Sequence, residues 1–426
     1  MRYKLPILAV LVLTLVATQP AFAALSPAAS FQNVWSRYDQ PVADQSAGRS
    51  WTWGPAPISG LLGEDFRLPG TQPPLPDGKR MVQYFDKGRM EINDPDGDAT
   101  SPWFVTSGLL PIELMTGNKQ TAYDQYARWK ESYISAIGDP GSFPAYPDLI
   151  TLYKSPGDVQ PAALGKPVID FLNLDLTITQ FTDYASDPAT VLLAGSNNYG
   201  VPRAFVDFQQ QQGLIERNGS IVPGQVYDPL FIFGLPVTPP VWTRSIVGSI
   251  ERLILFQVLE RRVLTYNPAN PPAFRVEMGN VGQHAYRWQT DPEAAREWDA
   301  LNWDTIDQDA HSVTARTDPH VIYTLEVERT DQIYPGGIRD PQATYRVYAS
   351  QDGGATRDLR FTGSVGPSCQ SALHIALLRP HNPQAVAGRI GLMAQCSQNP
   401  SELRGAGVTF LTSYDGGRTF LLRGQI

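Results

Sequence analysis

The sequence predicts a mainly β protein, in which a pseudo-duplicated N-terminal β-rich domain precedes a small antiparallel β domain of two propeller-blade-like units. Three observations lead to this fold class. Proline and glycine are frequent and scattered, with 37 and 36 residues, which is typical of short strands joined by many turns. The N-terminal half contains an internal repeat of a turn and a hairpin. The C-terminal part repeats a turn motif of Ser, Asp, Gly and Thr.

Residues 1–23 have the pattern of a secretory signal peptide. Arg2 and Lys4 precede the apolar run 5–17, and the small-x-small triplet Ala-Phe-Ala follows it. We expect cleavage after Ala23 and a secreted, extracellular chain; a retained N-terminal anchor is the alternative. The run is shorter than the about 20 residues that cross a bilayer, and no other run of the sequence is long and apolar enough.

Net charge and cysteine content narrow the function classes. The formal net charge is −8 at pH 7, and no Lys/Arg cluster of the kind that contacts phosphates is present, so nucleic-acid binding is not expected. The two cysteines, Cys369 and Cys396, are predicted to form a disulfide in an oxidising compartment. Two buried thiols are the alternative.

The N-terminal domain, about 31–290, contains two similar copies. The first, about 31–117, holds SWTWGPAPISGLLGEDF and then RMVQYFDKGRMEI; the second, about 200–290, holds DPLFIFGLPVTPPVWT and then RLILFQVLERRVLTY. Alternating apolar residues predict a hairpin in each copy, after a Gly/Pro-rich turn. Such a repeat indicates two similar units that share one core.

An insert, 118–199, separates the two copies. Its spaced aromatic and charged residues predict a short helix over 121–137. One or two strands are expected over 166–182, and a helix or a strand over 199–215.

The C-terminal domain, 305–426, follows a linker at 291–304. Alternating strands separated by polar turns are expected over 320–327, 344–363, 374–380, 389–396 and 408–424. The stretch SYDGGRTF contains Ser413, Asp415, Gly417, Thr419 and Phe420. An earlier copy, SQDGGATR, contains Ser350, Asp352, Gly354 and Thr356, with Arg357 in place of the aromatic residue.

The turn motif has a mechanical explanation. The Asp side chain accepts hydrogen bonds from backbone N–H groups of its own turn, and glycine takes a positive φ without a Cβ clash. Ser and Thr hydroxyls bond across the hairpin, and the terminal aromatic packs onto the sheet. These residues are therefore predicted to be structural. His320 and His374 occupy equivalent repeat positions and are also expected to be structural.

Several segments resemble known families. SYDGGRTF resembles the Asp-box (BNR) hairpin of sialidases, which lies away from their catalytic centre, so this resemblance implies no catalytic residue. RSWTWGP, VQYFDKGRMEI, DPLFIFGLPVT and VEMGNVGQHAYRW resemble a family of secreted bacterial proteins without an established activity, over about 31–290. FGLPVT and FQVLERRVLTY are remotely similar to the LGFP repeat of cell-wall-associated proteins, which implies an envelope-binding role.

Motifs for catalysis are missing from the sequence. It contains no Gly-x-Ser-x-Gly, no His-Glu-x-x-His and no phosphate-binding Walker loop. Glycosidases need two carboxylates across a cleft. Asp304, Asp307, Asp309 and Glu260 are available, but their pattern is that of a linker and a hairpin.

Two sets of residues are candidates for ligand binding. Asp94, Asp96 and Asp98 alternate around a glycine, which is typical of a solvated acidic turn or of a turn that holds Ca²⁺. No other cofactor is expected. The candidates for stacking on sugar rings are Trp51, Trp53, Trp103 and Trp242, and the His284 side chain is a further candidate; core packing is the alternative for each.

These observations favour a secreted, non-enzymatic binding or scaffolding protein of the cell envelope. The expected partner is a cell-wall or extracellular glycan. A glycoside hydrolase of the sialidase-like type is the alternative function.

Overall fold

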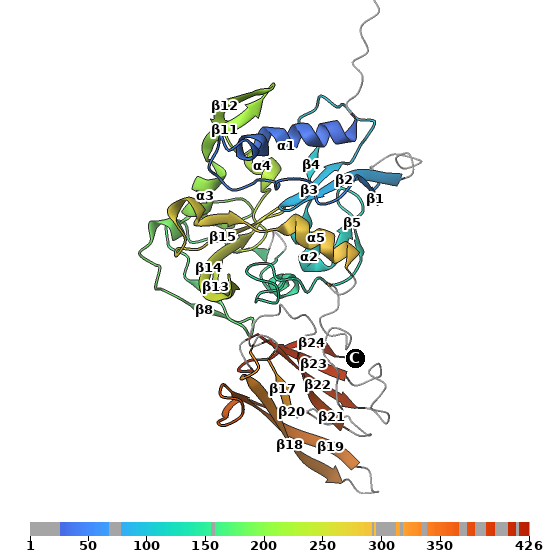
Figure 1. The fold of residues 1–426 in the computed structure, drawn as a ribbon, viewed down its shortest axis with the longest axis vertical. Helices are drawn as coiled ribbons and strands as arrows, with labels where there is room; N and C mark the ends of the chain where they lie inside the picture. The colour runs from blue at the N-terminus through green and yellow to red at the C-terminus, as the bar shows by residue number, and fades with distance from the viewer. Residues whose placement is uncertain are drawn as a thin grey trace, which may run out of the picture.

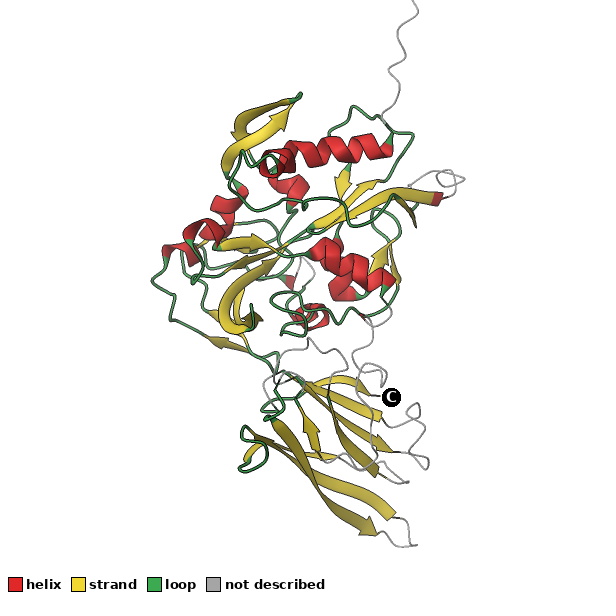
Figure 2. Cartoon of the chain, viewed as in Figure 1, coloured by secondary structure: helices red, strands yellow, loops and turns green. Residues whose placement is uncertain are grey.

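A computed structural model describes residues 26–67, 78–154, 158–291, 294, 312–315, 318–333, 339–365, 373–379, 389–396, 408–414 and 417–425. Strands hold 38% of the residues and helices 19%, which confirms the mainly β fold class. The strands lie in several sheets, and the helices belong to the N-terminal part (Figures 1 and 2). The predicted signal peptide, 1–23, lies outside the described residues. Among the described residues, no helix has the length and apolar character needed to cross a membrane.

Two sheets form the centre of the N-terminal part. The first has the order β1-β2-β3-β4, with β1 (Leu62–Asp65), β2 (Lys79–Phe85), β3 (Gly88–Ile92) and β4 (Thr106–Ser107). The second has the order β16-β15-β14-β13-β7-β8, with β7 (Asp170–Leu172), β8 (Ile178–Gln180), β13 (Val241–Val247), β14 (Ile250–Val258), β15 (Val263–Tyr266) and β16 (Val276–Met278). Neighbouring strands are antiparallel, except that β13 and β7 are parallel.

Helices and short hairpins surround these sheets. The helices are α1 (Pro27–Ala43), α2 (Leu110–Thr116), α3 (Arg203–Gln209), α4 (Pro229–Ile232) and α5 (Val281–Thr290). The short hairpins pair β5 (Asn118–Gln120) with β6 (Tyr126–Arg128), β9 (Leu192–Ala194) with β10 (Gly200–Pro202), and β11 (Gln212–Arg217) with β12 (Ser220–Gln225). The helix predicted over 121–137 is wrong, because no residue of this segment is helical and its residues 126–128 form strand β6, which pairs with β5.

The two main hairpins have matching surroundings. In the β2–β3 hairpin, Phe85 forms an isolated bridge to Pro57; in the β14–β15 hairpin, Leu259 forms one to Pro236. The N–H of Lys87 donates to Trp53 O, and the N–H of Arg261 donates to Phe233 O. The strands β1–β4 and β13–β16 form two sets of four. In each set the third strand pairs with the fourth, and a helix follows: α2 after β4 and α5 after β16.

Each hairpin turn also contacts the other hairpin's sheet. Lys87 Nζ donates to Met278 O at 2.8 Å, and Arg261 Nη1 donates to Ser107 O. Gly282, at the start of α5, packs so closely on the β2–β3 turn that an added Cβ would lie 2.0 Å from Phe85 O. The two hairpins are therefore held together by reciprocal contacts between their turns and strand ends.

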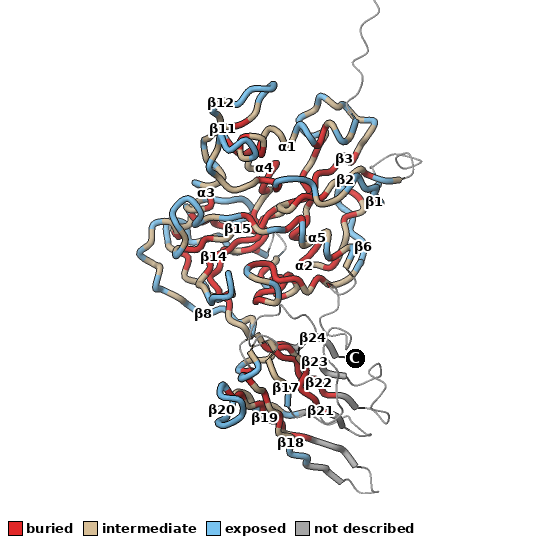
Figure 3. The backbone as a smooth tube through the Cα atoms, viewed as in Figure 1, coloured by how far each residue is buried: buried red, intermediate tan, exposed pale blue. Residues whose placement is uncertain are grey.

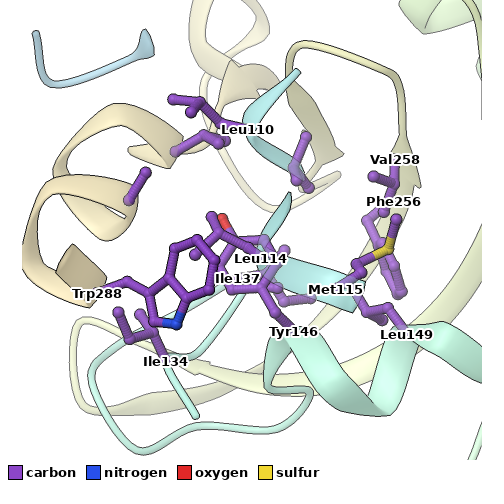
Figure 4. Close-up of a cluster of buried hydrophobic side chains, with 14 of the residues drawn as sticks. Leu110, Leu114, Met115, Ile134, Ile137, Tyr146, Leu149, Phe256, Val258 and Trp288 are labelled. Carbon is purple, nitrogen blue, oxygen red and sulfur yellow. The ribbon is translucent and has the colours of Figure 1, made fainter. Parts of the chain in front are cut away.

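The core of the N-terminal part lies on both faces of the two hairpins. Successive residues of β14 alternate between two apolar clusters, with Phe256 in one and Leu255 in the other. The first cluster packs against α2 and α5, as the side chains in Figure 4 show. The second packs against α1, α3 and α4. Figure 3 shows that buried backbone runs through the centre of this part.

The C-terminal part consists of two four-stranded antiparallel sheets. The first contains β17 (Ser312–Thr314), β18 (Ile322–Ile333), β19 (Arg339–Ser350) and β20 (Asp358–Val365), and the second contains β21 (Leu373–Leu378), β22 (Ile390–Cys396), β23 (Val408–Ser413) and β24 (Leu421–Gln425). In each sheet the strands follow chain order. Val347 and Leu392 belong to an apolar cluster that both sheets share. Tyr414 contacts Phe143 of the N-terminal part, with ring centroids 6.0 Å apart.

Candidate functional site

A cluster of buried charged side chains lies at the β2–β3 hairpin. Arg80 on β2 and Arg89 on β3 are both fully buried, although both strands are otherwise largely apolar. Three carboxylates surround them: Glu64 on β1, Glu91 on β3 and Glu113 on α2. The two arginines thus connect three consecutive strands and the helix that follows them.

The geometry of this buried cluster pairs each guanidinium with carboxylates. Arg89 donates to both oxygens of Glu113, at 3.0 and 3.2 Å. Arg80 donates to Glu64 at 3.1 Å and to Glu91 at 3.2 Å. Burial raises the pKa of Glu64, but the charges of Arg89 and Arg80 outweigh burial and hold this pKa well below its usual range. Glu64 therefore stays ionised at neutral pH.

Two partly buried side chains connect the buried cluster to the surface. Gln289 on α5 donates through Nε2 to Glu64 Oε1 at 3.2 Å and accepts from Lys119 Nζ at 3.0 Å. The Lys119 ammonium lies 5.0 Å from the ring centroid of Trp129. The Trp129 side chain is 51% exposed. A continuous set of contacts therefore runs from an exposed aromatic ring to a buried carboxylate.

The local backbone explains the position of Trp129. Gly117 ends α2 in the left-handed conformation, with φ 68°, and the chain continues into β5. The N–H of Trp129 then donates to Gly117 O at 3.0 Å, just beyond β6. This bond holds Trp129 beside Lys119, which lies on the neighbouring strand β5.

The electrostatics of the buried cluster favour the ionised form of Glu64. Three cations (Arg80, Arg89 and Lys119) face three carboxylates, so the charges balance. A glycosidase needs one carboxylic acid that stays protonated near neutral pH, whereas the pKa of Glu64 is lowered. Of the carboxylates considered from the sequence, Asp304, Asp307 and Asp309 lie outside the described residues.

The tryptophans that are candidates for stacking on sugars, with core packing as the alternative, lie in different environments. Trp53 and Trp242 are fully buried, so neither presents a ring face to a ligand, and as stacking candidates they are corrected to core residues. Both rings pack among other aromatic side chains. Trp51 is partly buried, and Trp103 is 46% exposed.

His284 lies on α5 beside Tyr146. Its Nδ1 is 3.0 Å from Tyr146 Oη, and the two rings meet edge to face. Burial, together with the positive charges of Arg287 and Lys87, lowers the pKa of His284 to about 3. The imidazole is therefore neutral at pH 7.

This lowered pKa predicts acid sensitivity. The unfolded chain protonates His284 near pH 6.5, whereas the folded chain does so only near pH 3, so protons favour the unfolded chain between these values. Between pH 7 and pH 5, the free energy of unfolding should fall by up to about 2 kcal/mol on this account. Urea unfolding at both pH values measures the change. In His284→Gln the fall should be smaller, and an equal fall in both proteins contradicts the assignment.

In the acidic turn at 94–98, the carboxylates of Asp94 and Asp98 accept separate local hydrogen bonds. Asp94 Oδ1 accepts from the N–H of Asp96 at 3.2 Å, and Asp98 Oδ1 accepts from the N–H of Thr100 at 2.9 Å. Within the described residues, no group of three or more His, Cys, Asp or Glu side chains is arranged to hold a metal ion. Ca²⁺ binding at this turn stays a prediction.

The turn after β19 is closed by its own side chains. Asp352 accepts from the N–H and the hydroxyl of Thr356, at 2.9 and 2.7 Å, and Ser350 Oγ accepts from the N–H of Gly354 at 2.8 Å. The two bonds from Thr356, together with one from the Ser350 hydroxyl, lower the pKa of Asp352 to about 2. Arg357 lies over the Tyr348 ring, 4.5 Å from its centroid.

The turn after β23 is partly described. Ser413 Oγ accepts from the N–H of Gly417 at 2.8 Å. Phe420 packs on Phe361 of the other sheet, with centroids 4.9 Å apart. Asp415 lies outside the described residues, as do Cys369 and the side chain of Cys396, so the disulfide also stays a prediction.

The sequence interpretation missed the charged cluster and Trp129. A signal was present in GRMEI, because Arg89 and Glu91 are two residues apart on an otherwise apolar strand and so share one face. Nothing in the sequence shows that Glu64, Glu113 and Gln289 meet them, since these residues come from three other elements.

Comparisons with known proteins add no relative. No family model, no curated protein and no solved structure matches the chain.

Proposed function

We propose that this protein is a secreted, non-enzymatic binding or scaffolding protein of the cell envelope, and that it binds a cell-wall or extracellular glycan at Trp129. The observation that carries the proposal is the half-exposed Trp129 ring beside Lys119 and Gln289. Secretion and the envelope location rest on the predicted signal peptide, 1–23, and on the LGFP resemblance.

This arrangement has the two features that sugar recognition needs. The C–H face of a pyranose ring is apolar and packs on an exposed aromatic ring, while its hydroxyls require fixed polar groups close by. Lys119 and Gln289 hold each other at 3.0 Å, and Gln289 is held in turn by Glu64. Their positions are therefore set before a ligand arrives, which reduces the entropy cost of binding.

Other exposed aromatic side chains occur near Trp129 in the sequence. Tyr123 is 55% exposed and Tyr126 is 39% exposed, and both belong to the β5–β6 hairpin region that positions Trp129. The Tyr123 ring meets the buried Phe66 ring edge to face, with centroids 5.5 Å apart.

We also propose that the N-terminal part is a pseudo-duplication. The equal strand orders of β1-β2-β3-β4 and β13-β14-β15-β16, and the helix after each, support this. So do the reciprocal bonds from Lys87 to Met278 O and from Arg261 to Ser107 O. Two copies of one unit that meet about a pseudo-twofold axis make such exchanged contacts.

The C-terminal sheets are proposed to be two Asp-box, propeller-blade-like units. Their chain-order strand arrangement and the self-closed turn at Asp352 support this. On this proposal the turn residues stabilise the hairpins and take no part in catalysis.

A Trp129→Ala variant tests the glycan site. We expect its affinity for the bound glycan to fall at least about tenfold, which corresponds to about 1.4 kcal/mol, because the stacking surface is removed. Pull-down with insoluble peptidoglycan and a glycan array identify the ligand, and titration calorimetry measures the affinity.

Trp103→Ala is the matched control, because the Trp103 ring is similarly exposed, at 46%, but it contacts Phe231 and not the Lys119–Gln289 pair on which the proposal rests. Its affinity should stay close to that of the wild type. Equal losses in the two variants, or a wild-type protein that binds no glycan, contradict the proposal. Turnover of fluorogenic glycosides that a single carboxylate substitution abolishes would instead support the glycoside hydrolase alternative.

A further inference from the structure

A second buried group of charges, distinct from the Glu64 cluster, lies near the β14–β15 turn. Arg262 is fully buried, and its guanidinium carbon lies 4.8 Å from the ring centroid of Trp53. Asp39 on α1 and Arg49 in the loop after α1 lie in the same neighbourhood, with Arg49 Nη1 4.0 Å from Asp39 Oδ1. Asp39 interacts electrostatically with Arg262 as well.

The donors in this group outnumber the acceptors. Arg262 Nη1 donates to Arg261 O at 2.8 Å and to Ser107 Oγ at 3.3 Å. In contrast, Arg262 Nε and Nη2 have no hydrogen-bond partner among the described residues, and neither does Trp53 Nε1 or Arg49 Nε. Buried donors without partners cost free energy, so a native protein usually supplies an acceptor for them.

The nearby carboxylate is already used by the backbone. Asp39 accepts from the N–H groups of Thr52 at 2.8 Å, Trp53 at 2.7 Å and Gly54 at 3.2 Å. It therefore fixes the loop that carries Trp53, and it has little capacity left for the guanidinium groups. Tyr227, the other ionisable group that faces both arginines, keeps its proton at neutral pH because burial raises its pKa to about 12.

The ionised groups around Arg262 also include few anions. Asp39 is the carboxylate that interacts with both Arg49 and Arg262, so two buried cations share one anion. Lys87 and Arg261 also interact with Arg262, but each has carboxylates of its own, Asp86 and Glu277 for Lys87 and Glu91 and Glu260 for Arg261. The cluster around Glu64 differs, because there each arginine contacts carboxylates directly. Arg262 interacts with Asp39 at longer range, and it has no ion pair of its own among the described residues.

We propose that a small monovalent anion of about the size of chloride binds at Arg262, against the Nε and Nη2 edge of its guanidinium and the Nε1 of Trp53. The hairpin turn packs closely against the end of the guanidinium, because a Cβ added to Gly88 would lie 2.5 Å from Nη1 and 2.8 Å from Nη2. The occupant would neutralise the excess charge and accept the unpartnered hydrogen bonds. It would also connect the β14–β15 hairpin to the loop that carries Trp53, which packs beside the β2–β3 hairpin.

A bromide soak tests the site directly in the folded wild-type protein. Crystals grown without chloride and soaked in bromide should show an anomalous peak within hydrogen-bond distance of Arg262 Nε or Nη2. A water molecule there, or no peak at all, would overturn the proposal whatever the stability measurements show.

Thermal unfolding provides the second measurement. At constant ionic strength, replacing gluconate by chloride or bromide should raise the melting temperature by about 2–4 °C, because the anion binds only the folded chain. Acetate as a further arm distinguishes a spherical halide site from one that accepts a carboxylate. Equal melting temperatures in gluconate, chloride, bromide and acetate would count against the site.

Substitutions assign the effect to Arg262. In Arg262→Met the chloride-dependent rise should disappear. In the control Arg244→Met, which removes an exposed guanidinium paired with Glu251 at 2.9 Å, the rise should persist. A rise that persists in Arg262→Met would place the anion elsewhere. If Arg262→Met does not fold, the bromide peak in the wild type still decides.

Discussion

Glu113→Ala is expected to lower the free energy of unfolding by about 3–5 kcal/mol, the usual cost of removing one partner from a buried ion pair. Glu113 is fully buried and accepts two hydrogen bonds from Arg89. It also lies 3.7 Å from Arg80 and accepts from the N–H of Gln120 at 3.2 Å. Without it, two buried guanidinium groups keep only Glu64 and Glu91 as counter-ions. Chemical denaturation, followed by tryptophan fluorescence, measures the loss.

Glu251→Ala is the control for this substitution. Glu251 pairs with Arg244 at 2.9 Å, but both side chains are more than half exposed. An exposed pair contributes about 0–1 kcal/mol, so this variant should unfold almost as the wild type does. Comparable losses in the two variants would show that burial does not decide the strength of these ion pairs.

Trp242→Ala is expected to cost about 3–5 kcal/mol of folding stability, because it opens a large cavity in the core. Trp242 is fully buried on β13, and its Nε1 donates to Val168 O at 3.0 Å. Its ring stacks on Tyr184, with centroids 4.9 Å apart. If this variant loses glycan binding, the loss should therefore be accompanied by unfolding. Circular dichroism and denaturant titration measure the unfolding.

Trp103→Ala again supplies the comparison, because the same residue type is removed from a half-exposed position. Its stability should change by no more than about 0.5 kcal/mol. If Trp242→Ala instead kept the wild-type stability and lost its ligand, Trp242 would return to the role of a ligand-binding residue.

Much of the strand structure was predictable because its signals are local. The pattern MVQYFDKGRMEI alternates and contains a turn, and the structure forms the β2–β3 hairpin there. The same holds for the strands expected over 344–363 and 408–424, which correspond to β19–β20 and β23–β24. The alternation of apolar and polar residues indicates which side chains face a core, and turn residues indicate where the chain reverses. Both signals can be read without knowing which distant residues the strand contacts.

Of the helices that the sequence analysis did not predict, α1 and α4 do begin with a capping side chain and a proline, at Ser26 and Asp228, whereas α5 lacks such a local signal. No side chain caps the start of α5, because Asn280 makes no capping hydrogen bond. Instead, the N–H of Gln283 donates to Asp86 O on the first hairpin, at 3.0 Å. The start of α5 is thus set by a residue far away in the sequence, which sequence patterns do not record.

The sequence by itself determined the strand periodicity, the repeated turn chemistry and the presence of many aromatic residues, because each depends on neighbouring residues. The tertiary structure alone decided which tryptophan is exposed and which is buried, since Trp129 and Trp242 differ only in what packs around them. It also decided that charges from β1, β2, β3 and α2 meet in one buried cluster. The burial of a side chain and the pairing of its charge both depend on neighbours that are distant in the chain. These neighbours come together only when the chain folds.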